Sequence, residues 1–395
     1  MIFDFKMKRS LIFTGFLLCG ILIKAQTLDN LSFGSQNTFE IMTWNIETFP
    51  KNGQISIDYA TQIIEALNVD FIAIQEVSDI AAFEQLASNL ANYNGYIEST
   101  YYDGLAFLYK PEVITINNIY RIYSNSVYWN TFPRAPMVID ITYNNQTIFI
   151  INNHLKCCGD GLLNLSDIND EEYRRYEAIY LLKTFMDLDL QNEHIILVGD
   201  LNDELTDNSS NNVFAELLND PANYVFADYD IASGNSSNWS FPSWPSHLDH
   251  ILISNELFDE FALNDSGIQT IKIDDYLAGG WFEYDQNVTD HRPVALKLFI
   301  DSNLGIKEVA ENEISNFMNY PNPFNSETTF SFHKNKGEAE IQIYNVLGQL
   351  IFSKKIPHNK TEYQWVPKAL ANGIYYSKLF LDKEEVANRK VILSK

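Results

Sequence analysis

The feature that most constrains this chain is a short apolar run that ends in a glycine and two polar residues. Residues 195–198 (Ile-Ile-Leu-Val) are followed by Gly199, and Asp200 and Asn202 come next. β-Branched residues in a run of this length predict a buried strand, and Gly199 is expected to allow a sharp turn. Polar side chains at the carboxyl end of a strand lie where α/β sheets bind ligands, although an ordinary Asx turn fits the same residues.

The same association of an apolar strand with polar residues at its end recurs along the first 300 residues. The strands are predicted at 39–46, 69–77, 104–109, 138–143, 147–155, 246–253 and 295–300, with helices at 55–67, 81–90 and 171–186. Some connections are helical and others β-like, which favours an α/β sandwich of two packed sheets over a doubly wound parallel sheet. Six strand ends with prominent carboxylates are typical of a divalent-metal site for phosphate chemistry.

The charge of the chain is unevenly distributed. Residues 26–304 contain 11 Lys and Arg against 41 Asp and Glu, whereas residues 305–395 contain 12 against 10. The acidic segment argues against non-specific binding of polyanions through basic patches. It does not exclude a polyanionic substrate that is held through a bound divalent cation.

Residues 1–25 have the pattern of a secretory signal peptide. Lys6, Lys8 and Arg9 precede an apolar run at 11–23, and cleavage is expected after Ala25. The run is short for a membrane span, and no other segment is apolar enough, so the mature chain is predicted to have no transmembrane segment.

Short motifs in a fixed order resemble those of the endonuclease/exonuclease/phosphatase superfamily. They lie at 44–45 (Trp-Asn), 75–76 (Gln-Glu), 153–155, 199–202, 246–249 and 289–293 (Thr-Asp-His-Arg-Pro). The superfamily includes deoxyribonucleases, abasic-site endonucleases, sphingomyelinases, deadenylases and inositol-phosphate phosphatases. The resemblance covers about residues 38–301. It implies the deoxyribonuclease-like two-sheet sandwich and Mg²⁺ or Mn²⁺ as cofactor, with Ca²⁺ as an additional structural ion.

The resemblance also implies which residues hold the metal and activate water. Glu76 would be the principal metal ligand, with Asn45 and Asp290 completing or supporting the metal site. Asp200 would orient and deprotonate the attacking water, and Asn202 would position the water or a phosphate oxygen.

The remaining roles concern the phosphate. His291, paired with Asp249, would bind the scissile phosphate, and His154 would stabilise the transition state or protonate the leaving oxygen. Arg134 and Asn153 are expected to bind the substrate. The abasic-site branch usually carries a tyrosine at the position of His154, which disfavours a role in base-excision repair.

The other histidines and the cysteines lack such a constellation. Packing and substrate contact are equally good interpretations of His250, and a structural or surface role is expected for His194, His247, His333 and His358. Cys157 and Cys158 are adjacent in an exported chain, and we hypothesise a vicinal disulfide. Two free thiols or an intermolecular bridge are the alternatives.

The C-terminal part has a different character. Residues 302–318 are polar and acidic and predict a linker, and alternating strands then predict a small all-β sandwich at 319–395. Its segments at 319–324 (Asn-Tyr-Pro-Asn-Pro-Phe), 344–349 and 372–376 resemble the C-terminal sorting domain of the type IX secretion system. That resemblance implies the secretion machinery as a partner. An adhesive or carbohydrate-binding sandwich is the alternative.

These observations predict a catalytic domain at 36–301 in a monomeric protein that is secreted or attached to the cell surface. The expected activity is that of a metal-dependent phosphoesterase, first of all a nuclease acting on extracellular nucleic acid. A phosphatase or a sphingomyelinase-like phospholipid phosphodiesterase is the enzymatic alternative, and a surface binding protein is the non-enzymatic one.

Overall fold

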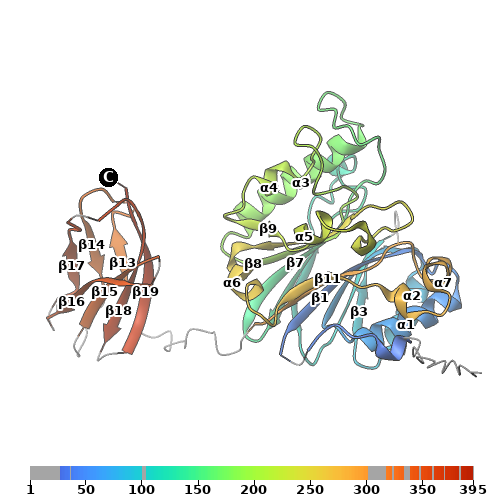
Figure 1. Cartoon of the computed structure of the whole chain (residues 1–395), viewed down its shortest axis with the longest axis horizontal. Coiled ribbons are helices and arrows are strands. Elements are labelled where there is room, and N and C mark those ends of the chain that lie inside the picture. The colour runs from blue at the N-terminus through green and yellow to red at the C-terminus, as the bar shows by residue number, and fades with distance from the viewer. Residues whose placement is uncertain are drawn as a thin grey trace, which may run out of the picture. The chain divides into compact units, whose positions relative to one another are not determined.

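The computed structural model describes residues 27–35, 37–99, 104–300 and, with short gaps, 317–394. It divides into two units at residues 301 and 302, each with its own core (Figure 1). The predicted signal peptide and all but the last two residues of the predicted linker lie outside the described residues. Within the part that is described, no helix is long and apolar enough to cross a membrane.

The first unit is built on two sheets of six strands each, which confirms the predicted two-sheet sandwich (Figure 1). The first sheet has the order β11 (Gly267–Thr270), β12 (Val294–Leu298), β1 (Phe39–Phe49), β2 (Phe71–Val77), β4 (Gly104–Tyr109) and β3 (Asn94–Ile97). The second sheet has the order β5 (Thr115–Arg121), β6 (Met137–Tyr143), β7 (Gln146–His154), β8 (His194–Asp200), β10 (Asp249–Ser254) and β9 (Tyr224–Phe226).

Each sheet contains one parallel pair of strands that is joined by a helix. β1 and β2 are connected through α1 (Gln54–Leu67), and β7 and β8 through α3 (Glu171–Asp189). The other strand pairs in these two sheets are antiparallel. Because parallel neighbours end at the same edge, each sheet brings two strand ends together, and these ends carry the predicted site.

Alternation along the strands produces three apolar layers. On β1 and β2, Ile41 and Phe71 belong to the core between the sheets, whereas Met42 and Ile72 pack with α1 and α2 (Ile80–Asn89). A third core joins α3 to the outer face of β7 and β8. The helices therefore cover the two outer faces of the sandwich and leave the strand ends accessible (Figure 1).

A buried polar bridge crosses the apolar layer between the sheets. Gln75 accepts a hydrogen bond from Thr43 Oγ1 (3.2 Å) and donates one to Asn152 Oδ1 (2.8 Å). The Asn152 amide in turn donates to the carbonyl groups of Ile74 and Ala106. All of these side-chain groups are buried and paired, so the bridge fixes the position of one sheet against the other.

The structure corrects the expected role of Gly199. The residue lies inside β8, opposite Asn153 of β7 and His250 of β10, and does not form a turn. Its φ is 149°, and a Cβ at this position would lie 2.0 Å from the carbonyl oxygen of Asn153. The turn follows at Asn202, whose φ is 56°.

The segment from 205 to 246, which the sequence predicts as one long loop with a short helix, is more structured than expected. It contains α4 (Ala215–Leu218), strand β9 at the edge of the second sheet, and α5 (Tyr229–Ala232). Beyond it, α6 (Phe258–Phe261) and α7 (Gly280–Asn287) complete the helices of this unit.

The second unit is all-β, as predicted. Three strands form one sheet in the order β13 (Met318–Tyr320), β14 (Thr328–Ser331) and β17 (Glu362–Trp365). Four strands form the other in the order β16 (Leu350–Ile356), β15 (Ala339–Asn345), β18 (Gly373–Leu381) and β19 (Glu384–Leu393). Aromatic residues such as Phe330 and Trp365 fill its core.

The close approach at Gly199 predicts a large cost for Gly199→Ala. The added methyl group must displace the backbone of β7, which we expect to cost about 1–3 kcal/mol of unfolding free energy. Gly267→Ala is the matched control, because the nearest atom to a Cβ there is 3.9 Å away. Urea unfolding followed by tryptophan fluorescence measures the unfolding free energy of both variants. Equal stability of the two would contradict the close approach of Gly199 to the backbone of β7.

Candidate active site

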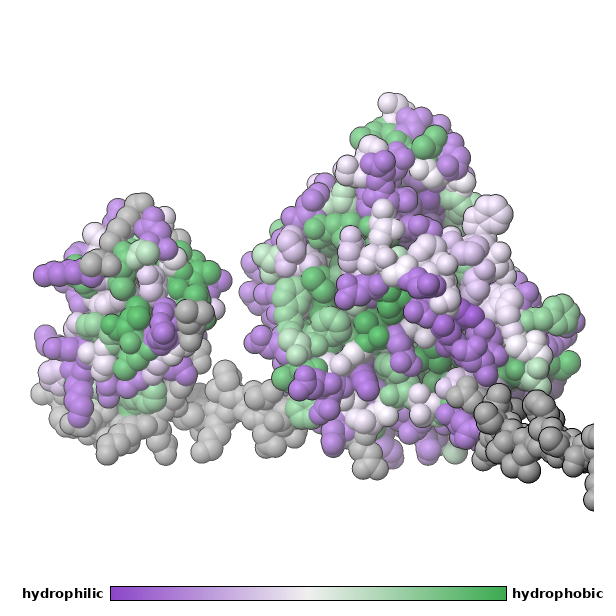
Figure 2. All heavy atoms as spheres, viewed as in Figure 1, coloured by the Kyte–Doolittle hydropathy of each residue, from purple (hydrophilic) through white to green (hydrophobic). Residues whose placement is uncertain are grey.

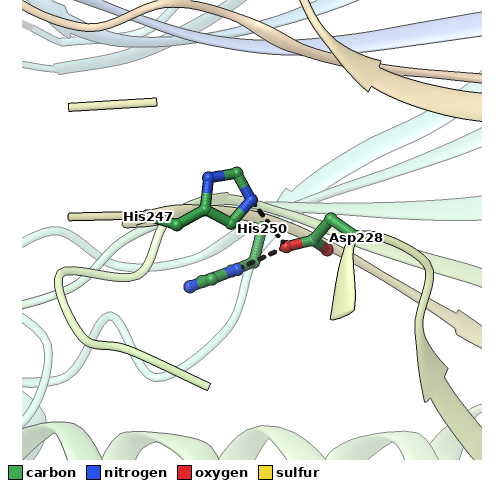
Figure 3. Close-up of side chains that lie close together, drawn as sticks. All are labelled: Asp228, His247 and His250. Carbon is green, nitrogen blue, oxygen red and sulfur yellow. Dashed lines mark hydrogen bonds and ion pairs between the residues drawn. The ribbon is translucent and has the colours of Figure 1, made fainter. Parts of the chain in front are cut away.

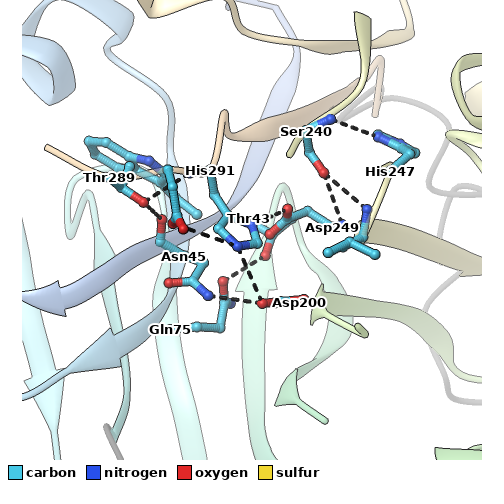
Figure 4. Close-up of polar contacts among 12 residues, drawn as sticks. Thr43, Asn45, Gln75, Asp200, Ser240, His247, Asp249, Thr289 and His291 are labelled. Carbon is cyan, nitrogen blue, oxygen red and sulfur yellow. Dashed lines mark hydrogen bonds and ion pairs between the residues drawn. The ribbon is translucent and has the colours of Figure 1, made fainter. Parts of the chain in front are cut away.

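The ends of the two parallel pairs meet at one edge of the sandwich, where a single amide joins two carboxylates. Asn45 Nδ2 on β1 lies 3.0 Å from Glu76 Oε1 on β2 and 2.9 Å from Asp200 Oδ2 on β8 (Figure 4 shows Asn45 and Asp200). Asn45 and Asp200 are buried, and Glu76 is partly buried. The contact therefore connects the two sheets at the point where their carboxylates converge.

Glu76 is held by the backbone as well. Its φ of 65° is uncommon for a residue with a side chain, and such residues cluster at functional sites. The backbone N–H of Thr48 donates to Glu76 Oε2 at 3.0 Å. The carboxylate is thus fixed in one orientation by Thr48 and Asn45.

His154, the last residue of β7, faces the same two carboxylates. Its Nε2 lies 3.6 Å from Asp200 Oδ2 and 3.8 Å from Glu76 Oε1. Burial lowers the pKa of His154 well below its usual value, and the charges of Arg134 and His291 act in the same direction. Its Nδ1 is buried without a hydrogen-bond partner among the described residues. The imidazole is therefore neutral here.

His291 forms the opposite side of the cluster and is oriented by Asp249. The distance from His291 Nδ1 to Asp249 Oδ2 is 2.7 Å, so this nitrogen carries a proton (Figure 4). Its Nε2 lies 3.8 Å from Asp200 Oδ2 and 3.9 Å from Asp290 Oδ1. Burial lowers the pKa of His291, but the Asp249 and Asp200 carboxylates outweigh it and raise the pKa to about 10.

The donor set fits a divalent cation. One ligand atom from each of Glu76, Asp200 and His154 lies within 4.8 Å of the others. Burial raises the pKa of Asp200 to about 7, and the negative charges of Asp249 and Glu76 add to this effect while His291 opposes it. A hard cation between the carboxylates would remove this penalty, and carboxylate oxygens are the ligands that Mg²⁺ and Mn²⁺ prefer.

The other predicted site residues are placed differently. Asp290 lies on the His291 side of the cluster, with Oδ1 3.9 Å from His291 Nε2. Asn202 donates from Nδ2 to the carbonyl oxygen of Leu155 (3.3 Å), beside His154. Asn153 is buried, and its amide donates to the carbonyl oxygen of Ile151 at 2.9 Å. Because side chains alternate along a strand, Asn152 lies on the same face of β7 as His154, and the sequence pattern already indicated this.

A second buried network supports Asp249 from behind. The backbone N–H of Asp249 donates to Ser240 Oγ (3.2 Å), and the Ser240 N–H donates to His247 Nδ1 (3.2 Å) (Figure 4). His247 Nε2 therefore carries the proton and donates to Asp228 Oδ2 (3.1 Å) (Figure 3). His247 is structural, as expected, but Asp228 and Ser240 lie in a segment whose sequence gives no sign of this role.

His250 belongs to the same network and not to the substrate-facing cluster. Its Nδ1 is 2.6 Å from Asp228 Oδ2, and its Nε2 is 2.9 Å from the carbonyl oxygen of Asp203 (Figure 3). Both nitrogens face acceptors, so His250 is an imidazolium. Burial lowers the pKa of His250, but Asp228 outweighs it and the pKa is raised. Since both histidines have partners at each ring nitrogen, this triad is a hydrogen-bonded network and not a metal site.

A cavity of about 610 Å³ lies against the loop that follows β7, at Lys156 and Cys157. Four cationic residues line it, of the 11 Lys and Arg residues between positions 26 and 304. They are Arg121, Arg134, Lys156 and Arg174, and among the described residues the lining includes one acidic residue, Glu98, which pairs with Arg121 at 2.8 Å. The exposed ring of Trp129 forms another part of the wall. In an acidic domain, this concentration of positive charge gives the cavity a local potential that attracts anions.

Cys157, another lining residue, does not form the hypothesised vicinal disulfide. Cys157 and Cys158 are free thiols with their sulfur atoms 2.9 Å apart, and both are exposed. Of the remaining histidines, His194 is partly buried at the start of β8, whereas His333 and His358 lie outside the described residues.

The fold and the edge cluster define the class of α/β-sandwich phosphoester hydrolases. Residues 42–291 match the model of the endonuclease/exonuclease/phosphatase family, and residues 318–394 match that of the secretion system C-terminal sorting domain. A search of curated proteins finds no match.

Several solved structures match this chain at low sequence identity, and the fold is shared with TDP2 of D. rerio. TDP2 of D. rerio, complexed with a single-strand DNA product, is 12% identical with a TM-score of 0.51, over 66% of this chain and 98% of that one. The human Nocturnin catalytic domain with bound sulfate is 15% identical with a TM-score of 0.48, over 67% and 96%. An endonuclease/exonuclease/phosphatase from Bacteroides vulgatus is 13% identical with a TM-score of 0.47, over 67% and 99%.

Because the family model matches more than half of its residues, the chain belongs to the endonuclease/exonuclease/phosphatase family. Members of this family are divalent-metal-dependent hydrolases of phosphoester bonds. The sorting domain indicates export by the type IX machinery to the cell surface or the medium.

The buried ion pair behind the site predicts a pH-dependent cost for Asp228→Asn. Leaving the His250 imidazolium unbalanced should cost about 3 kcal/mol of unfolding free energy. Because the folded-state pKa of His250 is raised, its contribution is fully present below the unfolded histidine pKa of about 6.5 and is lost as pH rises through the folded value.

The difference in unfolding free energy between wild type and Asp228→Asn should therefore be largest near pH 6 and smaller at alkaline pH. Exposed Asp230→Asn, two residues further along, is the control. A loss of unfolding free energy in Asp228→Asn that does not change with pH would contradict the charged state of His250.

Proposed function

We propose that this protein is an exported, divalent-metal-dependent phosphodiesterase that hydrolyses nucleic acid outside the cell. The observation that supports it best is the convergence of Glu76, Asp200 and His154 at one edge, with the His291–Asp249 pair opposite. Carboxylates for a cation and imidazoles for phosphate oxygens are what in-line attack on a phosphodiester requires, since negative charge accumulates on oxygens that are already anionic.

Each residue would contribute a definite step. Asp200, fixed by Asn45, would orient the attacking water and accept its proton. Protonated His291, fixed by Asp249, would donate a hydrogen bond to a non-bridging phosphate oxygen. Neutral His154 would donate a hydrogen bond from Nε2 to the same phosphate or to the leaving oxygen. Mg²⁺ or Mn²⁺ held by Glu76 and its neighbours, with Asp290 and Asn45 in support, would supply Lewis-acid stabilisation of developing charge.

The cationic cavity supports a substrate with more than one anionic group. Arg134 and Lys156 connect the cavity to the cluster. The charge of Arg134 lowers the pKa of His154, and Lys156 follows His154 by two residues. A neighbouring phosphate of a nucleic-acid strand would bind the cations, and a base would stack on Trp129. The acidic remainder of the domain favours a short or single-stranded segment over a long duplex.

A phospholipid phosphodiesterase is the second candidate, because apolar residues are exposed beside the cavity. Val127, Leu162, Leu165 and Ile168 lie with Trp129 in two loops that touch through a hydrogen bond from Asn130 to the carbonyl of Ile168. The loop before α3 projects at the top of Figure 1, and Figure 2 shows hydrophobic residues at that tip. Exposed apolar groups next to cations suit a membrane interface.

Glu76→Gln should abolish metal-dependent activity while leaving the fold intact. Removing the charge of the principal ligand is expected to lower kcat/KM by at least about 10²-fold. Exposed Glu65→Gln is the control on a neighbouring helix. Plasmid DNA, RNA, sphingomyelin and sugar phosphates, each with and without chelator, form the substrate panel.

Turnover of nucleic acid that stops with chelator and in Glu76→Gln supports the proposal. Activity only on sphingomyelin favours the second candidate, and activity that survives both treatments contradicts a metal-dependent mechanism.

The cavity predicts that Arg121→Gln and Arg174→Gln raise KM more than they lower kcat. Each loss of a charged contact to a phosphate outside the reacting centre should raise KM roughly tenfold. Lys183→Gln is the control, since it lies on the same helix as Arg174 but is not among the residues that line the cavity. An unchanged KM for an oligonucleotide in both arginine variants would exclude the cavity as a substrate site.

A further inference from the structure

An exposed tryptophan lies in the middle of a short turn whose base contacts His291. The turn spans residues 241–246, and its ends are joined by backbone hydrogen bonds from Phe241 N–H to the Ser246 carbonyl (3.0 Å) and from Ser246 N–H to the Phe241 carbonyl (3.1 Å). The Phe241 ring packs against the His291 imidazole, with ring centroids 4.8 Å apart. Trp244 is 78% exposed. The turn therefore presents a large aromatic side chain to solvent within three residues of a ring that contacts His291.

The start of the turn is fixed to the backbone that orients His291. Ser240 Oγ accepts hydrogen bonds from the backbone N–H groups of Leu248 (3.1 Å) and Asp249 (3.2 Å). The Ser240 carbonyl accepts a third from the backbone N–H of Arg292 (2.7 Å). Because Asp249 pairs with His291 and Arg292 follows it in the chain, the turn and the imidazole share one support.

The middle of the turn is restrained as well. The indole N–H of Trp281 donates to Ser243 Oγ at 3.3 Å. Pro242 and Pro245 stand on either side of Ser243 and Trp244, and each proline ring fixes one backbone dihedral angle. A side chain on a backbone that is already ordered loses less conformational entropy when a ligand binds to it.

Packing within the protein does not account for Trp244. The described residues give its indole neither a hydrogen bond nor a ring contact. The indole N–H groups of Trp44, Trp239 and Trp281, in contrast, each donate a hydrogen bond. Single exposed apolar residues are common, but tryptophan is enriched at binding surfaces, where its ring supplies contact area and its N–H a polar group.

The charges near the turn favour a neutral group as the ligand of this indole. Arg292 is paired with both carboxylate oxygens of Asp274 (2.8 and 2.5 Å), and its guanidinium lies 5.4 Å from the ring centroid of Trp281. Its positive charge is therefore already compensated. Phosphate groups gain little beside such an ion pair in an acidic domain, whereas the face of a base stacks on an aromatic ring without needing a cation.

We propose that Trp244 binds, by stacking, a base next to the phosphate that His291 contacts. The inference rests on the proposed hydrolysis of nucleic acid and defines a further subsite for that substrate. Trp244 and Phe241 are three residues apart, at most about 11 Å along the backbone, so the indole is within reach of a flanking base.

Two indoles would then hold the strand on opposite sides of the reacting phosphate. Trp129 lines the cavity at the loop after β7, whereas Trp244 belongs to the turn beside His291. A base in a duplex must leave its partner and its neighbours before it can stack on a protein ring, at a cost in free energy. The arrangement therefore favours single-stranded nucleic acid as the substrate.

The test is a binding measurement on the full mature chain in MgCl₂, which separates base recognition from turnover. The probes are two short, fluorescein-labelled single strands with phosphorothioate linkages, which resist hydrolysis. One carries adenine at every position, and the other has the same backbone without bases. Fluorescence anisotropy should show that Trp244→Ala weakens binding of the adenine probe by about 5- to 150-fold and leaves binding of the base-free probe unchanged.

Substitutions at the same position separate stacking from apolar contact. Trp244→Phe should keep most of the affinity for the adenine probe, because a smaller ring still stacks. Trp244→Leu, which is apolar but not aromatic, should bind as weakly as Trp244→Ala. Tyr180→Ala is the matched control, since its ring is also exposed (52%) but lies on α3 and is not among the residues that line the cavity.

Several results would overturn the proposal. They are equal affinity of wild type and Trp244→Ala for the adenine probe, equal weakening for both probes, wild-type affinity in Trp244→Leu, and no preference of the wild type for the adenine probe. Loss of binding to vesicles of phosphatidylcholine and phosphatidylserine in Trp244→Ala, with unchanged binding of the adenine probe, would assign the turn to a membrane instead.

The outcome is distinguishable from that of the proposed hydrolysis. A preference for the adenine probe that depends on Trp244, in a chain that cleaves no nucleic acid, would contradict the activity and support the subsite. Cleavage of nucleic acid without that preference would support the activity and contradict the subsite.

Discussion

The structure of the first unit depends on the pairing of two carboxylates from different sheets through one amide. Asn45 contacts Glu76 within its own sheet and Asp200 across the sandwich. Asp200 is buried and has its pKa raised to about 7 by burial and by nearby negative charge. An arrangement of this kind is unfavourable for stability alone, and a divalent cation bound at Glu76 beside Asp200 would offset the repulsion between the two carboxylates.

The fold holds these groups together by repeating one unit. A strand, a helix and a parallel strand occur once in each sheet, so four strand ends meet at a single edge. The Gln75–Asn152 bridge fixes the sheets in the layer below. Behind the histidine pair, the Asp228–His247–Ser240 network holds the backbone of Asp249, which in turn orients His291. The geometry of the proposed active site is therefore supported by buried polar contacts at several levels.

The sequence predicts the parts of this arrangement that depend on local patterns. Strands with continuous apolar runs, such as β8, and helices with clear periodicity, such as α1, are found within one or two residues of their predicted bounds. The polar residues at their ends identify most of the edge cluster. Contacts between distant segments could not be derived in this way. Nothing near Asp228 indicates that it pairs with His247 and His250, and the parallel register that requires Gly199 is visible only when β7 lies beside β8.

The central claim is that a divalent cation binds between the carboxylates of Glu76 and Asp200. Crystals of the catalytic unit soaked in MnCl₂ and measured near the manganese absorption edge test it most directly. The account predicts an anomalous difference peak between these two carboxylates, within bonding distance of Glu76. Data that show manganese bound elsewhere and none at Glu76, at concentrations that support activity, would contradict it.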